Sequence, residues 1–140
     1  MAVTRGSLPV AVAIGSAREH EGRRLIPLME SIRIKTTRGR PRKRPETVYA
    51  DTKYATPLNR FYLSKKRIGY QIPSKETRRK PGRPKRFDRA TYHRVRYTVE
   101  RFFAWVKAFR RITIRYERVS AAYSGFVHLA CITLHLRILK

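Results

Sequence analysis

The apolar residues of this chain lie in short segments of two periodicities, and their order limits the possible folds more than any other feature. The strand-like segments are rich in β-branched and aromatic residues and cover residues 8–14, 47–51 and 67–74. The helix-like segments cover residues 23–34, 56–66, 89–110 and 120–139. Strands and helices alternate until two helices end the chain, which is typical of an α/β fold with helices covering a sheet.

Several of these segments have polar residues at their ends. Thr56 is suited to cap a helix, and Pro57 follows at the first helical position, where its missing N–H is tolerated. Asp88 holds the same capping position before the helix predicted over residues 89–110. Asp51 ends a predicted strand, which places a carboxylate at the carboxyl end of that strand.

Charge limits the partners of the chain. Lys and Arg number 34 against 9 Asp and Glu, which gives a formal net charge of +25 at pH 7. Such a chain repels itself unless a polyanion screens it, so nucleic acid is the expected partner. An anionic membrane is the alternative, but no apolar run reaches the roughly 18 residues that a membrane span needs. We therefore expect no membrane partner.

Cys131 is the sole cysteine, so no disulfide can form within the chain. A reducing compartment is therefore expected, and for a chain of this charge it is the cytoplasm, with association with the nucleoid. His128 and His135 flank Cys131 at spacings that could suggest zinc. The run around them is apolar, however, and predicts a packed helix instead.

Two basic, proline-rich loops, at about residues 33–46 and 75–87, share the element Gly-Arg-Pro flanked by Arg or Lys. This element is the core of the AT-hook, in which an extended backbone lets arginines enter the minor groove of A·T-rich DNA. Contact with phosphates alone, or a role in solubility, are the alternatives left open. The residues expected to contact DNA from these loops are Arg38, Arg40, Arg83 and Lys85.

The helix predicted over residues 89–110 has two distinct faces. An apolar stripe at three-four spacing is expected to pack on the sheet. It consists of Val95, Val99, Phe102, Val106 and Phe109. A second stripe is polar, since spacings of three, four and seven residues return to nearly the same face. It consists of His93, Arg96, Glu100 and Lys107.

Glu100 is therefore one carboxylate among basic side chains. An ordinary helical ion pair with Arg96 would explain it alone, at roughly 0.2 to 0.5 kcal/mol. Asp51 supports a different interpretation, because ligands usually bind at the carboxyl ends of strands in α/β sheets. Two carboxylates can hold Mg²⁺ against a phosphodiester while Arg and Lys bind the phosphates. This predicts that Asp51 and Glu100 lie within about 10 Å of each other.

The segments "VYADTKYAT" and "HRVRYTVERFFAWVKAFRRI" resemble the C-terminal half of DDE-type transposases of bacterial or archaeal insertion sequences. That group has a signature of Tyr, two residues, Arg, three residues, Glu, six residues and Lys. Arg96, Glu100 and Lys107 match this spacing, while the Tyr position falls on His93 and Tyr92 lies one residue earlier. The flanking segments are similar too, so the resemblance covers nearly the whole chain.

The resemblance implies an RNase H-like fold with a short mixed sheet covered by helices and a long C-terminal helical region. It also implies DNA transposition through cleavage and strand transfer that depend on Mg²⁺ or Mn²⁺. Asp51 and Glu100 would be the catalytic metal ligands, and Arg96, Lys107 and His93 would contact phosphates. The expected partners are the DNA of the element's ends and of its target, and a second copy of the active transposase.

In that family the first catalytic Asp lies upstream of the segment that resembles residues 8–14. We therefore expect residues 1–140 to form a single incomplete catalytic domain with a truncated fold. We expect it to be inactive or incomplete alone, poorly soluble, and dependent on a product of an upstream reading frame. The alternative is a small basic nucleic-acid-binding protein without catalysis.

Overall fold

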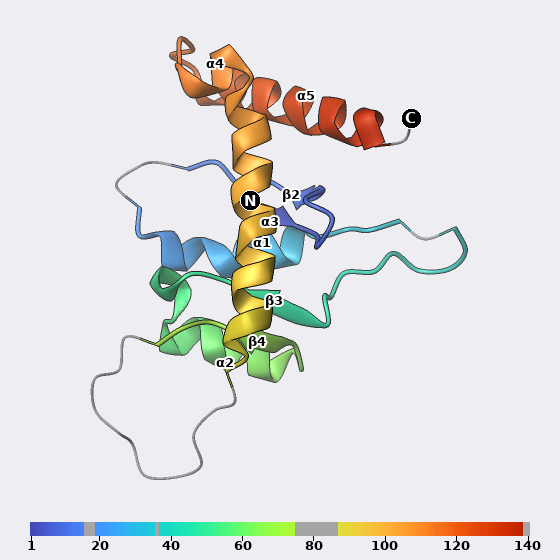
Figure 1. Cartoon of the computed structure of the whole chain (residues 1–140), viewed down its shortest axis with the longest axis vertical. Helices are drawn as coiled ribbons and strands as arrows, with labels where there is room; N and C mark the ends of the chain where they lie inside the picture. The colour runs from blue at the N-terminus through green and yellow to red at the C-terminus, as the bar shows by residue number, and fades with distance from the viewer. Residues whose placement is uncertain (16–18, 36, 75–86, 139–140) are drawn as a thin grey trace. The chain divides into compact units, whose positions relative to one another are not determined.

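A computed structural model of the chain describes residues 1–15, 19–35, 37–74 and 87–138 (Figure 1). The chain divides into two compact units, which are described separately below. One unit comprises Gly15–Arg96, and the other combines Met1–Ile14 with Tyr97–Lys140. Residues 75–86 of the second basic loop, with Arg83 and Lys85, lie outside the described residues.

The unit of Gly15–Arg96 contains a strand–helix–strand arrangement. Strands β3 (Thr47–Tyr49) and β4 (Gly69–Gln71) pair in parallel, and helix α2 (Pro57–Lys65) lies between them in the sequence. Helix α1 (Leu25–Ser31) precedes them. The unit also contains two short 3₁₀ helices, η1 at Glu21–Arg24 and η2 at Thr52–Tyr54, and the first part of α3 (Arg89–Lys107).

Among the described residues, the interior of this unit is mostly apolar. Its buried apolar and aromatic side chains are Leu25, Met29, Ile32, Leu63, Ile68, Ile72 and Tyr92. Asn59 of α2 is equally buried, and its Nδ2 donates to the carbonyl oxygens of Gly22 at 2.8 Å and Tyr54 at 3.1 Å. Because these carbonyls belong to η1 and η2, Asn59 ties both 3₁₀ helices to α2.

The capping predictions are confirmed. The Thr56 hydroxyl oxygen accepts a hydrogen bond from the Asn59 amide at 3.2 Å, and Pro57 is the first residue of α2. Asp88 accepts from the Thr91 amide at 3.0 Å, in the first turn of α3 (Arg89–Lys107). Each cap satisfies an amide that helix geometry leaves without a partner, which typically stabilises a helix by about 1 kcal/mol.

The other unit consists of a small hairpin and helices. Strands β1 (Ala2–Val3) and β2 (Pro9–Ala11) pair antiparallel. The second part of α3 is followed by α4 (Arg110–Thr113) and α5 (Ser120–Ile138). The core lies between α3 and α5, and its buried residues are Phe102, Val106, Val127, Cys131 and Leu134. None of the helices in the described part of the chain is long and apolar enough to cross a membrane.

The predicted elements are present, but several differ in extent. The described strands have two or three residues and form two separate two-stranded sheets. The strand predicted over residues 8–14 pairs only at Pro9–Ala11. The helix predicted to reach residue 110 ends at Lys107, where the Thr113 hydroxyl donates to the Lys107 carbonyl at 2.7 Å. Apolar residues continue at helical spacing as far as Phe109, so the sequence pattern did not indicate that the helix ends at Lys107.

Candidate active site

Asp51 lies two residues beyond strand β3, at the carboxyl end of a parallel strand pair. Its Oδ1 accepts a hydrogen bond of 2.7 Å from the Thr52 amide, so the side chain caps η2. The residue is exposed. This is the edge of an α/β sheet at which ligands usually bind, and a carboxylate there suits a cation.

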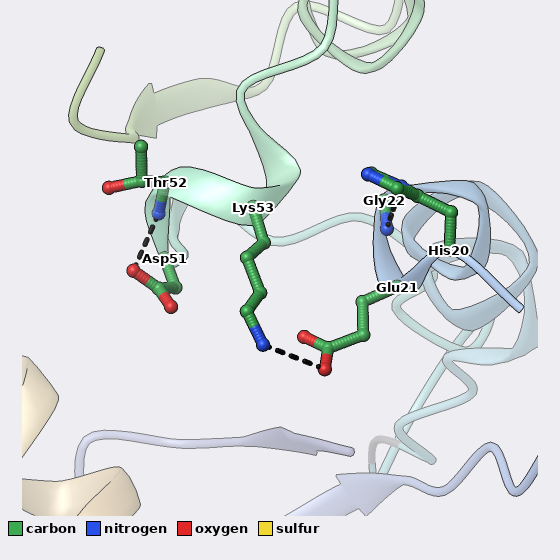
Figure 2. A network of polar contacts seen from close by, with 6 residues as sticks. All are labelled: His20, Glu21, Gly22, Asp51, Thr52 and Lys53. Atoms are coloured by element: carbon green, nitrogen blue, oxygen red, sulfur yellow. Dashed lines mark hydrogen bonds and ion pairs between the residues drawn. The ribbon is translucent and has the colours of Figure 1, made fainter. Parts of the chain in front are cut away.

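Figure 2 shows Asp51 with the polar residues of the two 3₁₀ helices. Lys53, two residues after Asp51, donates to the Glu21 carboxylate at 3.0 Å and links η2 to η1. This hydrogen bond and the charge of Glu21 raise the pKa of the Lys53 ammonium, and the charge of Asp51 adds a smaller effect. The Lys53 cation is therefore held beside the candidate metal ligand.

Figure 2 also shows His20 at the start of η1. Its Nδ1 accepts a hydrogen bond of 3.1 Å from the Gly22 amide, which makes His20 the cap of this short helix. When the imidazole is neutral, its proton is therefore on Nε2. An added side-chain carbon at Gly22 would lie only 3.0 Å from the Lys53 carbonyl oxygen, so the close approach of η1 and η2 favours glycine.

Tyr92 connects the first part of α3 to the strand end that carries Asp51. The side chain is buried, and its hydroxyl donates to the Ala50 carbonyl at 3.4 Å. The Phe87 ring packs on it with centroids 5.1 Å apart. The sequence did not lead us to predict this role. Tyr92 lies three residues before Val95 and so belongs to the same apolar stripe as Val95 and Val99, which could have indicated that it is buried.

Helix α3 has the two faces that its sequence predicted. The apolar stripe was expected to pack on the sheet, but Phe102 and Val106 are instead buried in a core with α5. The four residues of the polar stripe are all exposed, and they are His93, Arg96, Glu100 and Lys107. Because α3 is continuous from Arg89 to Lys107, helical geometry places these four on neighbouring turns of one face.

Arg101, next to Glu100, holds α3 to the β1–β2 hairpin. Its Nε and Nη2 donate to the Ser7 hydroxyl oxygen at 3.1 and 3.0 Å, and its guanidinium lies 5.6 Å from the centre of the Trp105 ring. Ser7 is fully buried and has a φ of 62°, a conformation that non-glycine residues rarely adopt. The sequence of this arginine-rich helix did not indicate that Arg101, rather than another arginine, would make this contact.

Asp51 lies in one compact unit and Glu100 in the other. Their predicted proximity therefore stays a prediction. Carboxylate oxygens are the ligands that Mg²⁺ prefers, and both side chains are exposed, so their chemistry fits this cation. No group of three or more His, Cys, Asp or Glu residues able to hold a metal occurs among the described residues.

The first basic loop forms an arm rather than the extended segment expected of an AT-hook. Ile34 and Arg42 form an isolated antiparallel β-bridge, which closes the loop. Arg38 and Arg40 lie near its tip and are exposed, as expected of residues that contact DNA. We refer to the described residues of this loop, 34–35 and 37–42, as the basic arm.

Comparison with known proteins identifies relatives of the chain. Residues 1–134 match the family model described as Transposase DDE domain. The chain is 33% identical over 124 residues to a transposase for insertion sequence element IS402 of Burkholderia cepacia, covering 88% of this chain and 54% of the relative.

A second relative is a transposase for element IS6501 of Brucella ovis, with 44% identity over 45 residues, covering 32% of this chain and 35% of that protein. No solved structure matches the chain significantly. The chain spans about half the length of the IS402 relative and less of the other. Since the family match includes Asp51, Glu100 and nearly all of the fold, this chain belongs to the family of transposase DDE domains.

Proposed function

We propose that this chain forms the part of an insertion-sequence transposase in which Asp51 and Glu100 hold a divalent cation, Mg²⁺ or Mn²⁺. The observation that supports this most is the exposed Asp51 carboxylate at the carboxyl end of a parallel strand, in a member of the DDE family. When bound, the cation supplies charge stabilisation at the scissile phosphodiester and activates the attacking hydroxyl. The substrates are the DNA of the element's ends and of its target.

The residues of this chain would bind and orient that DNA. Arg96, Lys107 and His93 share the exposed face of α3 with Glu100, so they are placed to contact phosphates around the reacting group. Asp51 keeps one oxygen on the Thr52 amide, which fixes the orientation of the carboxylate. Such positioning contributes much of the rate in phosphoryl transfer.

Complete activity in this proposal belongs to an assembly. An upstream polypeptide would add a further acidic ligand and complete a RNase H-like sheet, and two copies would act on the two element ends. The described chain contributes mixed α/β structure with small sheets, which is consistent with such a domain.

The test is strand nicking of a duplex carrying an element end, by the chain joined to the upstream segment, with and without Mg²⁺. Asp51→Asn keeps a side-chain acceptor for the Thr52 amide, so it removes charge without removing the cap of η2. We expect Asp51→Asn and Glu100→Gln each to lower nicking by at least about a hundredfold while DNA binding persists.

Glu46→Gln is the matched control, because Glu46 is an exposed carboxylate whose ion pair with Arg42 is long, at 3.8 Å. This variant should nick at the rate of the unmodified protein. Unchanged nicking in Glu100→Gln would remove that residue from the site. Binding without any metal-dependent nicking in the assembled protein would instead fit a basic nucleic-acid-binding protein.

A further inference from the structure

The basic arm has a defined base and a thin tip. Ile34 and Arg42 exchange two backbone hydrogen bonds of 2.9 Å, which close the arm at its base. Gly39 at the tip has a φ of +90°, and a side-chain carbon built there would meet nothing within 4 Å. Figure 1 shows this teal arm extending away from helices α1 and α2 of its own unit.

Arginines at the base and at the tip of the arm have different surroundings. At the base, Arg33 donates to the Ile32 carbonyl at 2.8 Å, and Arg44 donates to the Lys66 carbonyl at 2.9 Å, just beyond the end of α2. The Arg44 contact holds the base against the folded unit. Arg38 and Arg40 flank Gly39 and are exposed at the tip, together with Pro41.

The width of DNA grooves decides how such an arm can bind. The Cα atoms of a hydrogen-bonded antiparallel pair are about 5.5 Å apart, and side chains widen the ribbon further. The minor groove is about 6 Å wide, so the base of the arm does not fit into it. A tip without a side chain at Gly39 is thinner, and the planar guanidinium groups beside it can enter a narrow groove.

The chemistry of the tip favours A·T-rich sequences. The minor groove of A-tracts is narrow and strongly negative, and it attracts arginine because the guanidinium is weakly hydrated. We infer that the tip of the basic arm inserts Arg38 and Arg40 into the minor groove of A·T-rich DNA, so that the chain prefers such sequences. This inference rests on the proposed function only in that the chain binds DNA.

The experiment compares binding of the full chain to three duplexes of equal length by fluorescence anisotropy. One is A·T-rich, one is G·C-rich, and in the third every guanine of the G·C-rich duplex is replaced by inosine. Inosine lacks the N2 amino group, so its pairs resemble A·T in the minor groove and G·C in the major groove. We expect the A·T and inosine duplexes to bind about five- to tenfold more tightly than the G·C duplex.

The variant that tests the tip is Arg38→Lys with Arg40→Lys, which keeps both charges on an exposed segment. It should retain its affinity for G·C DNA and lose most of the preference for A·T and inosine DNA. Arg38→Gln with Arg40→Gln is the charge control. It should bind more weakly to all three duplexes and lower the slope of log affinity against log salt by about 2.

Equal affinity of the unmodified chain for the three duplexes overturns the inference, and so does a preference that the double lysine variant retains. An inosine duplex that behaves like G·C DNA also overturns it, because that result assigns the preference to the major groove. The preference does not depend on cleavage, so the same measurement on Asp51→Asn separates this inference from the catalytic proposal. That variant should show the full preference even if nicking is absent.

Discussion

At the scale of single residues, the polar groups that organise this chain are those that satisfy backbone atoms. Asp51 caps η2, His20 caps η1, and Asn59 ties both to α2. The capping roles of Thr56 and Asp88 could be predicted, because a cap acts within a few residues of its own position. The role of Asn59 could not, because its acceptor on Gly22 is distant in sequence and only the fold brings them together.

Asn59 gives a prediction at this scale. Asn59→Ala removes the Asn59 donor from the Gly22 carbonyl, while the Tyr54 carbonyl keeps the Thr56 amide at 2.8 Å, so we expect it to lower the free energy of unfolding by about 1 to 3 kcal/mol. Urea unfolding followed by circular dichroism measures this loss. Ser64→Ala, at an exposed position on the same helix, should change stability by less than about 0.5 kcal/mol. A loss below about 1 kcal/mol for Asn59→Ala contradicts the role assigned to it.

At the scale of elements, helices were easier to predict than sheets. The two faces of α3 follow from the spacing of Phe102, Val106 and Glu100, because helical periodicity is local. Strand pairing is not local, so the composition of residues 47–51 predicted a strand but not its parallel partner β4. Strand β1, with only Ala2 and Val3, was too short to show any pattern.

The contact between α3 and the β1–β2 hairpin gives a prediction at this scale. Ser7→Ala removes the hydroxyl that accepts both Arg101 hydrogen bonds, and Arg101→Met keeps an apolar stem beside Trp105. A double-mutant cycle on the free energy of unfolding should give a coupling of about 1 to 3 kcal/mol between the two positions. Ser7→Ala combined with Arg94→Met, on the same helix, should be additive. If the effects of Ser7→Ala and Arg101→Met on the free energy of unfolding are also additive, the contact between the two side chains does not stabilise the fold.

At the scale of the whole molecule, exposed apolar surface favours self-association of the chain, whereas its high net charge opposes it. The exposed residues of α5 include an apolar stripe at three-four spacing, with Leu129, Ile132 and Leu136 each more than half exposed. Exposed stripes of this kind are typical of helices that pack on another helix. The net charge of +25 opposes association of two copies until salt or DNA screens it.

We therefore expect the chain to self-associate as salt concentration rises, which sedimentation velocity measures. Replacing Leu129, Ile132 and Leu136 with glutamine should suppress this association while the helical circular dichroism signal is retained, since all three are exposed. The control replaces Leu58 and Phe61 on α2, which are equally exposed but form a separate pair. If the control suppresses association as strongly as the α5 variant, the stripe is not its cause.

We propose that one divalent cation binds both Asp51 and Glu100, and a cation that cuts the polypeptide around its own position tests this directly. Fe²⁺ in place of Mg²⁺, with ascorbate and peroxide, generates hydroxyl radicals that cut the polypeptide near the residues that bind the metal. In an assembly of the chain with the proposed upstream polypeptide, bound to DNA, we predict cuts near both residue 51 and residue 100. Asp51→Asn should remove both sets of cuts, and Glu46→Gln should remove neither. Cuts near only one of the two residues, or a pattern unchanged by Asp51→Asn, would contradict the shared site.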